Sequence, residues 1–432
     1  MLSDLTEQGA MAQEGAAWPA PPRRPQSLPP RHLWREWMAI IWPAVGVSVM
    51  LTFPALGVAG PILFLLLVAV QWVPISAVPM QRVIRCWPYA LLFLFAMLST
   101  LWSTAPLATL RYSAQLAITM IAGLMMGACA WPRRVMLSYA VGLVATVALG
   151  LVFGQSAAWG AQGDTAFVGL GGGKNYFADW CATALVMWVG AMAAMGPGGR
   201  GWRLALSLPV VAVLLAGLIS THSTGSTAAL AISCLLMAAM GVMRLLRPPV
   251  RAAMLALALA LVGVGSVAMS QPEVRSEILH MLNKDENLTG RRYLWYRGQG
   301  YMDERPWLGT GYGAFWLQGN LDAEGLWYIN GITGRKGFNF HNIAIETRVN
   351  MGLVGFGLLV ALCLGAVLSI LAGFLRRPLA TDLGWLGFAL YEMSRVTFET
   401  VGPTPFTHDT LLFCSVMGYA AVRRLNLAAQ ER

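Results

Sequence analysis

The chain has 432 residues, of which 57% are hydrophobic and only 12% are charged. A soluble domain carries roughly a quarter charged residues, so this composition argues against an ordinary soluble enzyme. The formal net charge is +10, but the arginines stand in short clusters between apolar blocks, a pattern typical of membrane proteins that argues against a nucleic-acid partner. We therefore expect a protein of the lipid bilayer.

The first segment, residues 1–32, is rich in Pro, Ala and Gln and lacks the apolar run of a signal peptide, so it predicts a disordered cytoplasmic tail. Apolar blocks of roughly 17–25 residues follow, long enough to cross a bilayer. We expect nine spans within 33–271 and three more, with a short cytoplasmic tail, within 343–432. The twelve spans lie at approximately 38–57, 58–75, 87–103, 108–130, 135–154, 174–195, 203–220, 225–243, 251–271, 343–374, 381–399 and 409–423.

Charge placement predicts the topology. With about twelve crossings both termini share one side, and the basic clusters then fall on that side, which the positive-inside rule makes cytoplasmic. The clusters are Arg82 and Arg85, Arg133 and Arg134, Arg200 and Arg203, Arg244 with Arg247 and Arg251, Arg376 and Arg377, and Arg423 and Arg424. We expect an all-α, multi-pass protein of a bacterial inner membrane with one long extracytoplasmic helical loop at 272–342.

Metal and cofactor signals are missing from the sequence. The six cysteines lie within or at the edge of apolar blocks, and none is spaced as CxxC. Neither HExxH nor DxD occurs, so the sequence predicts no disulfide framework, no metal site and no cofactor.

The loop at 272–342 carries the chemical motifs. It contains Thr-Gly-Arg-Arg-Tyr-Leu-Trp at 289–295, then Pro306 and a glycine-rich turn ending at Phe315 and Trp316, and finally His341 and Asn342, with Glu346 following. Thr289 or Asn287 can cap a helix that Pro306 ends.

With Gly-Gly-Gly-Lys-Asn-Tyr-Phe-Ala at 171–178, these motifs resemble the O-antigen ligase and Wzy polymerase superfamily, most closely its exopolysaccharide-polymerase (ExoQ-like) branch. The resemblance implies a glycosyltransferase of the periplasmic side. Its donor is a glycan on polyprenyl diphosphate, its acceptor a hydroxyl of a glycan, lipid or protein, and other polysaccharide export proteins are candidate partners.

On this hypothesis Arg291 is the first candidate to hold the departing diphosphate, because a planar guanidinium matches phosphate oxygens. Arg292 and Lys174 assist it. His341 is the candidate base that takes the acceptor's proton. Each has a structural alternative: a headgroup-contacting arginine, a snorkelling lysine and a capping histidine.

Five further residues complete the predicted site. Trp295 shares a helical face with Arg291, and Asn342 and Glu346 share another, where they could orient His341 or bind sugar hydroxyls. Interfacial aromatic belts explain the tryptophan equally well. Arg395 and Glu399 are also candidates: the pattern Glu392, Arg395, Glu399 predicts one polar helical face, and Glu399 matches a glutamate common in the resembled family.

One departure from the family concerns the end of the seventh span. Ligase relatives often have Ser-Arg there, whereas residues 220–226 read Ser-Thr-His-Ser-Thr-Gly-Ser. The second phosphate clamp is therefore missing or supplied by Arg111, Lys174 or Arg395. This favours a polymerase over the alternative of a ligase that moves finished glycan onto a lipid core or protein. A second alternative is a transporter, which should show internal repeats and broken helices.

Overall fold

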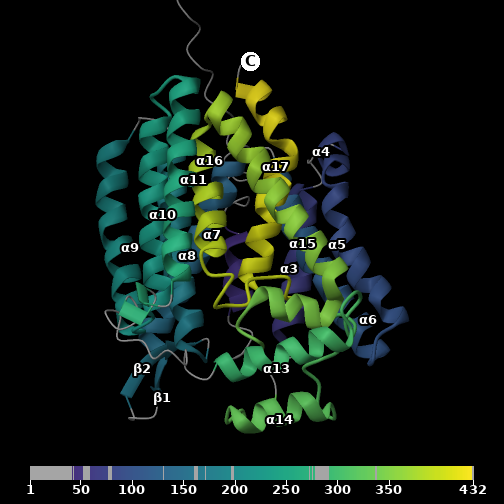
Figure 1. Ribbon diagram of the computed structural model, residues 1–432. Helices are drawn as coiled ribbons and strands as arrows, with labels where there is room; N and C mark the ends of the chain where they lie inside the picture. Colours follow the sequence, from purple (N-terminus) through teal and green to yellow (C-terminus); the bar gives the residue numbers. More distant parts are fainter. Residues whose placement is uncertain are drawn as a thin grey trace, which may run out of the picture. The chain divides into compact units, whose positions relative to one another are not determined.

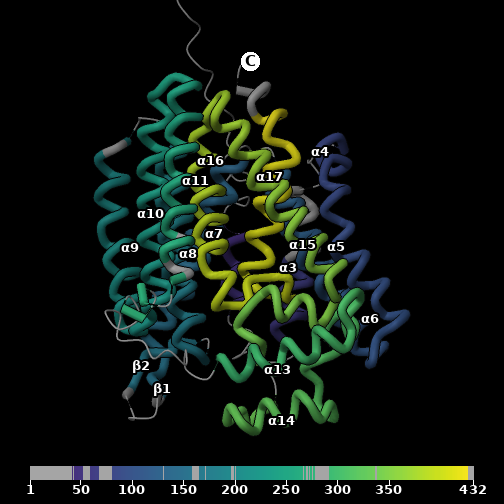
Figure 2. Tube along the Cα trace, viewed as in Figure 1, coloured from purple at the N-terminus to yellow at the C-terminus, as the bar shows by residue number. Residues whose placement is uncertain are grey.

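The protein is described from a computed structural model, in which residues 39–432 form one compact unit. The described residues are 41, 43–51, 59–75, 80–129, 131–159, 164–170, 172–195, 199–271, 273–274, 276–277, 291–335 and 338–430; Figure 2 draws the others in grey. The tail expected at 1–32 and the predicted caps Asn287 and Thr289 lie outside the described residues.

Most helices match the predicted spans within a few residues, although α16 ends earlier and α17 ends later than expected; Figure 1 shows their arrangement. In chain order they are α3 (Ala59–Ile75), α4 (Met80–Arg85), α5 (Trp87–Leu98), the short 3₁₀ helix η1 (Ser99–Leu101), α6 (Pro106–Ala128), α7 (Pro132–Phe153), α8 (Lys174–Ala194), α9 (Arg200–Ser220), α10 (Thr224–Met243), α11 (Pro248–Ser270), α15 (Ile343–Arg376), α16 (Ala380–Met393) and α17 (His408–Gln430). Among the described residues, six helices are long and apolar enough to cross a membrane. A largely helical, multi-pass fold is thus supported, and the number twelve stays a prediction.

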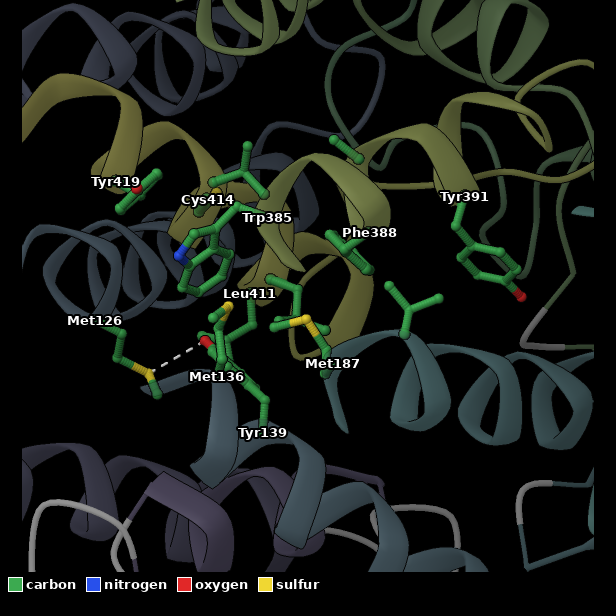
Figure 3. Close-up of a cluster of buried hydrophobic side chains, with 14 of the residues drawn as sticks. Met126, Met136, Tyr139, Met187, Trp385, Phe388, Tyr391, Leu411, Cys414 and Tyr419 are labelled. Atoms are coloured by element: carbon green, nitrogen blue, oxygen red, sulfur yellow. Dashed lines mark hydrogen bonds between the residues drawn. The ribbon is translucent and has the colours of Figure 1, made fainter. Parts of the chain in front are cut away.

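Helix α8 forms the centre of the unit and packs against α7, α16, α9 and α10. Its neighbours α16 and α17 contribute a dense apolar core with α6 and α7, in which Trp385, Phe388 and Leu411 are almost fully buried (Figure 3). The Tyr139 hydroxyl lies within this core and meets Ser415 Oγ at 2.8 Å. Because a buried hydroxyl without a partner is costly, this bond fixes how α7 meets α17.

Helices α6 and α17 approach each other closely because small residues face each other. A Cβ on Gly127 would lie 1.9 Å from the Ser415 carbonyl oxygen, and one on Gly418 would lie 2.2 Å from that of Leu124. Such glycine contacts are a common basis of helix packing in membranes.

A polar layer lies at one end of the helices (Figure 1). It contains α13 (Arg291–Glu304), α14 (Leu321–Ile329) and an antiparallel hairpin of β1 (Gln155–Trp159) and β2 (Asp164–Gly169). The helical part of the loop was predicted. The hairpin was not predicted, because its few small and polar residues gave no clear strand pattern. Its presence corrects the all-α expectation.

The glycine-rich turn after α13 fits into a kink of α15. Gly352 interrupts the helix with φ 65° and ψ −170°. The freed N–H groups of Leu353 and Val354 donate to the carbonyls of Pro306 and Trp307 at 2.8 and 3.1 Å. In return, Thr310 and Gly311 N–H groups donate to carbonyls 349 and 350, each at 2.9 Å. The turn therefore satisfies the backbone groups that the kink exposes.

Helix α16 is shorter than the predicted span 381–399. It ends at Met393, and residues 394–407 form turns before α17. Glu392, Arg395 and Glu399 therefore do not share one helical face, which corrects that expectation. Instead, Glu399 belongs to the connecting segment, at the same end as α13.

Candidate functional site

Glu399 is the point at which the predicted site residues meet. Its Oε1 accepts hydrogen bonds from Arg291 Nη2 and from Asn175 Nδ2, each at 3.0 Å. Its Oε2 lies 3.1 Å from His341 Nδ1. One carboxylate thus joins residues from α8, α13, the start of α15 and the segment after α16.

His341 is held in an unusual backbone conformation, with φ 49°. Its N–H donates to Asn339 Oδ1 at 2.8 Å, and Thr400 Oγ1 donates to the same oxygen at 3.1 Å. With Glu399 on Nδ1, the favoured tautomer of a neutral ring has its hydrogen there, which leaves the Nε2 lone pair available to a ligand. The His341 side chain is 25% exposed, so a ligand can reach it.

Arg291 is the first residue of α13 and lies between a carboxylate and a carbonyl. Besides Glu399, its Nη1 donates to the Phe398 carbonyl oxygen. A guanidinium has five N–H donors, so these two bonds leave others for an anion. The side chain is 17% exposed. Arg292, next in the helix, is exposed.

Trp295, Glu346 and Asn342 support the His341 backbone. Trp295 Nε1 donates to the Phe340 carbonyl at 2.8 Å, while Phe340 N–H donates to Glu346 Oε2 at 3.0 Å. Asn342 caps α15 by accepting from Ala344 N–H at 2.9 Å and donates from Nδ2 to the Thr397 carbonyl at 3.2 Å. These bonds explain why side chains that donate or accept hydrogen bonds surround the backbone of His341.

Asn175 is a site residue that was not predicted from the sequence. Besides donating to Glu399, it accepts from Ser223 Oγ at 3.1 Å, which connects α8 to the start of α10. Its neighbour Lys174 was the predicted diphosphate ligand of this segment, because it carries a positive charge. Lys174 opens α8 with a buried side chain, 9% exposed, and its role in binding diphosphate stays a prediction. The only available signal for Asn175 was its place in the Lys-Asn segment.

Arg395 lies outside this cluster. Its Nη1 bonds Asp179 and lies 2.9 Å from Glu392 Oε2, with only 5% of the side chain exposed. The structure therefore pairs it with Glu392 rather than Glu399. A direct contact with substrate at this depth is not supported, although Arg395 can still tune the field at Glu399.

Asp179 also belongs to a group that could hold a metal ion, together with His408 and Asp409. His408 Nε2 lies 3.0 Å from Asp179 Oδ2, and its Nδ1 lies 2.9 Å from Asp409 Oδ1. Each ring nitrogen faces a carboxylate and Arg395 already neutralises Asp179, so the group fits an ion-pair network better than a cation site. The expectation of no metal stays a prediction.

A cavity of about 320 Å³ with both polar and apolar groups in its lining opens beside the cluster. Three tyrosines and Trp316 line it, together with Asn339, Glu346, Asn350 and Thr400; the tyrosines are Tyr112, Tyr176 and Tyr312. Aromatic faces with hydrogen-bonding groups between them suit sugar rings, which present both C–H and hydroxyl surfaces.

The charge state of Glu399 follows from its neighbours. Burial alone would raise the pKa of the carboxyl, but the hydrogen bond with His341 and the charge of Arg291 outweigh burial and hold that pKa below its usual value of 4.5. Glu399 is therefore an anion near neutral pH, able to orient His341 and to stabilise a positive charge on it.

Comparison with known proteins agrees with the resemblance expected from the motifs. Residues 209–360 match the O-antigen ligase family. The chain is 28% identical over 368 residues to the exopolysaccharide production protein ExoQ of Rhizobium meliloti, which covers 83% of each protein. Among solved structures, a chain from a peptidoglycan synthase complex that couples polymerization and crosslinking covers 81% of this chain and 98% of its own, at 15% identity and a TM-score of 0.38. That similarity is too low to support an argument about fold or function.

Proposed function

We propose that the protein is a membrane glycosyltransferase that joins polyprenyl-diphosphate-linked oligosaccharides into an exopolysaccharide. The observation that carries this proposal is the cluster in which Glu399 bonds both a candidate base, His341, and a candidate anion binder, Arg291. The matches to the O-antigen ligase family and to an exopolysaccharide production protein support the substrate class.

In the proposed reaction, His341 Nε2 takes the proton of an acceptor sugar hydroxyl as its oxygen attacks the anomeric carbon of the donor. The bond from that carbon to the phosphate oxygen breaks, and its electron pair leaves with the polyprenyl diphosphate. Arg291 stabilises this developing charge, while Glu399 stabilises the imidazolium that forms. Diphosphate is a good leaving group, so the mechanism needs no general acid.

The two central residues should differ in their effect on turnover and donor binding. His341→Ala removes only the base, so we expect turnover to fall roughly 10²–10⁴-fold with donor affinity near that of the wild type. Arg291→Lys keeps the charge but loses the planar fork, so it should weaken donor binding and recover little activity. Polymer formation and donor binding are measured on purified protein at matched expression. Normal polymer from His341→Ala would contradict the base assignment.

Acceptor choice separates the polymerase from its alternatives. The missing arginine at 220–226 favours a polymerase, so the acceptor should be a second lipid-linked repeat unit. Purified protein supplied with donor alone should form a ladder of longer chains. Product only with a lipid-core or protein acceptor would indicate a ligase, and glycan movement across liposomes without a new bond would indicate a transporter.

We also expect the reaction to run without a metal ion, because Arg291 supplies the positive charge that a metal would otherwise provide. Transfer by purified protein should continue in excess EDTA. Activity that EDTA removes and magnesium or manganese restores would assign a catalytic cation, and Asp179→Asn would then show whether the group at His408 holds it.

A further inference from the structure

The segment that follows α16 holds the start of α15 in place through two of its backbone carbonyls. The carbonyl oxygen of Val396 accepts the N–H of Ile343 at 3.3 Å. The carbonyl oxygen of Thr397 accepts Asn342 Nδ2 at 3.2 Å. Both donors directly follow His341 in the chain, so the position of the imidazole depends on where this segment lies.

The next residues of the segment hold Arg291. The carbonyl oxygen of Phe398 accepts Arg291 Nη1, and the carboxylate of Glu399 accepts Nη2. The N–H groups of Phe398 and Glu399 in turn donate to the carbonyl oxygen of Arg395, at 3.0 and 2.9 Å. A turn that begins at Arg395 thus presents both acceptors to the guanidinium, and their placement depends on where Arg395 is fixed.

The side chain of Arg395 fixes this turn to α8. Its Nη1 bonds Asp179 Oδ1 and lies 2.9 Å from Glu392 Oε2. Asp179 is held from two further sides, since it accepts the Tyr391 hydroxyl at 2.9 Å and its Oδ2 lies 3.0 Å from His408 Nε2. All five side chains are at most 5% exposed. Breaking a buried ion pair leaves uncompensated charges, so Arg395 has one strongly favoured position.

A second bond joins the same turn to α8, one helical turn away from the first. Asn175 Nδ2 donates to Glu399 Oε1 at 3.0 Å. Asn175 lies four residues before Asp179, so both side chains belong to the same face of α8. One face of one helix therefore holds the turn at its beginning, through Arg395, and at its end, through Glu399.

We propose that Arg395 and Asp179 are positioning residues for the proposed glycosyl transfer. Their ion pair anchors the turn to α8, and the anchored turn sets the positions of His341 and Arg291 through its carbonyls and through Glu399. The effect on transfer rests on the proposed function, whereas the anchoring does not. Arg395 and Asp179 act on the reaction through the turn, not by contact with substrate.

The test compares this ion pair with a second buried pair of the same kind. Arg423 Nη2 lies 2.6 Å from Asp382 Oδ2, and these side chains are 5% and 0% exposed. Asp382 lies in the first turn of α16, whereas Arg395 follows its other end. Asp179→Asn/Arg395→Met removes the proposed anchor, and Asp382→Asn/Arg423→Met is the matched control. Each variant removes both charges of its pair, so neither partner stays buried alone.

The first readout is the unfolding temperature in detergent, which does not require an active enzyme. Glu399→Gln is introduced into the wild type and into each double variant. Without the anchor Glu399 no longer lies against its donors, so in Asp179→Asn/Arg395→Met this change should lower Tm by less than about half of its effect in the wild type. In Asp382→Asn/Arg423→Met the full effect should remain. An undiminished effect in both backgrounds would overturn the anchoring.

The second readout is kcat for transfer from a lipid-linked donor by purified protein. A displacement of about 1 Å can cost roughly 10²-fold in rate, so Asp179→Asn/Arg395→Met should lower kcat by roughly 10- to 10²-fold. The control pair lies away from the turn, so Asp382→Asn/Arg423→Met should keep kcat close to that of the wild type. An equal loss of kcat in the two variants would overturn the positioning role.

A milder pair of variants serves both measurements if Asp179→Asn/Arg395→Met does not fold. Asp179→Asn alone weakens the anchor while Glu392 still neutralises Arg395, and Asp382→Asn is its control. The same two outcomes, an undiminished effect of Glu399→Gln on Tm or an equal loss of kcat, would overturn the proposal. A wild type that transfers no glycan, with the expected result in Tm, would contradict the proposed function and leave the anchor supported.

Discussion

Glu399 connects the two charges on which the proposed chemistry depends. Arg291 must remain cationic and oriented while His341 gains and loses a proton, and the carboxylate between them favours both conditions. Asn175 holds the Oε1 atom in place, so the orientation does not depend on Arg291 alone. A substrate diphosphate would compete with Glu399 for Arg291, and the carboxylate would then keep its bonds with His341 and Asn175.

The bonds of Glu399 predict how stability depends on pH. Its pKa in the folded protein lies below 4.5, held there against burial by His341 and Arg291. The ionised Glu399 carboxylate therefore contributes fully to the stability of the folded protein above pH 4.5, and this contribution is lost as the pH falls through the pKa of the folded state. Glu399→Gln puts an amide N–H₂ against existing donors, so it should be less stable than the wild type by about 2 kcal/mol near neutral pH.

Thermal unfolding in detergent measures this difference. The gap in Tm between wild type and Glu399→Gln should be constant from pH 7 to about 5.5 and should shrink below 4.5, where Glu399 takes up a proton in the unfolded chain before it does so in the folded protein. Asp303→Asn, a change in an exposed acid of α13, is the control and should show no such gap. A gap that widens on acidification would mean that Glu399 is not stabilised as an anion.

At the scale of elements, the spans could be predicted within a few residues because an apolar block of about 20 residues is a local signal. The end of α16 could not be predicted, because Met393 before the boundary and Val396 after it are both apolar. The convergence of Asn175, Arg291 and His341 on Glu399 also depends on residues up to 224 positions apart, and no spacing rule predicts such pairs. Motif order identified three of these four residues.

The kink of α15 shows why the glycine-rich turn has its sequence. A Cβ on Gly352 would lie 2.2 Å from the carbonyl carbon and oxygen of Trp307, and its φ of 65° with ψ −170° is open essentially only to glycine. Gly309 meets the same constraint from the other side, since its Cβ would lie 2.6 Å from the Asn350 carbonyl carbon. The glycines of the turn therefore support the site structurally, while Tyr312 and Trp316 at its end line the cavity beside the cluster.

Gly352→Ala should consequently separate the turn from the kink and lower stability by more than about 3 kcal/mol, with loss of transfer activity. Gly357→Ala is the control on the same helix, because a Cβ there meets nothing within 4 Å. It should be neutral or stabilising by up to about 1 kcal/mol. Thermal unfolding and polymer formation measure both variants. Equal behaviour of the two would show that the kink is not required.

On the scale of the whole molecule, the site and the basic clusters lie at opposite ends of the helices. Ser223, just before α10, contacts Asn175 of the site, while Arg244 and Arg251 follow the other end of α10, 20 residues and roughly 30 Å away. Arg251 in turn bonds the carbonyls of Leu375 and Arg376 at the far end of α15, whose first turn holds the site. Helices α10 and α15 thus agree: each has the site at one end and basic residues at the other.

This polarity predicts the orientation in the membrane. By the positive-inside rule the end with Arg244, Arg251 and Arg376 is cytoplasmic, so α13, α14 and the cluster at Glu399 face outward. Alkaline phosphatase, which is active only outside the cytoplasm, should be active when fused at Asn320 and inactive when fused at Leu246, with equal expression of both fusions. The reverse pattern would place Glu399 in the cytoplasm, where a polymer could not form outside the cell without a further export step. It would therefore contradict the proposed function even if every hydrogen bond of the cluster were correct.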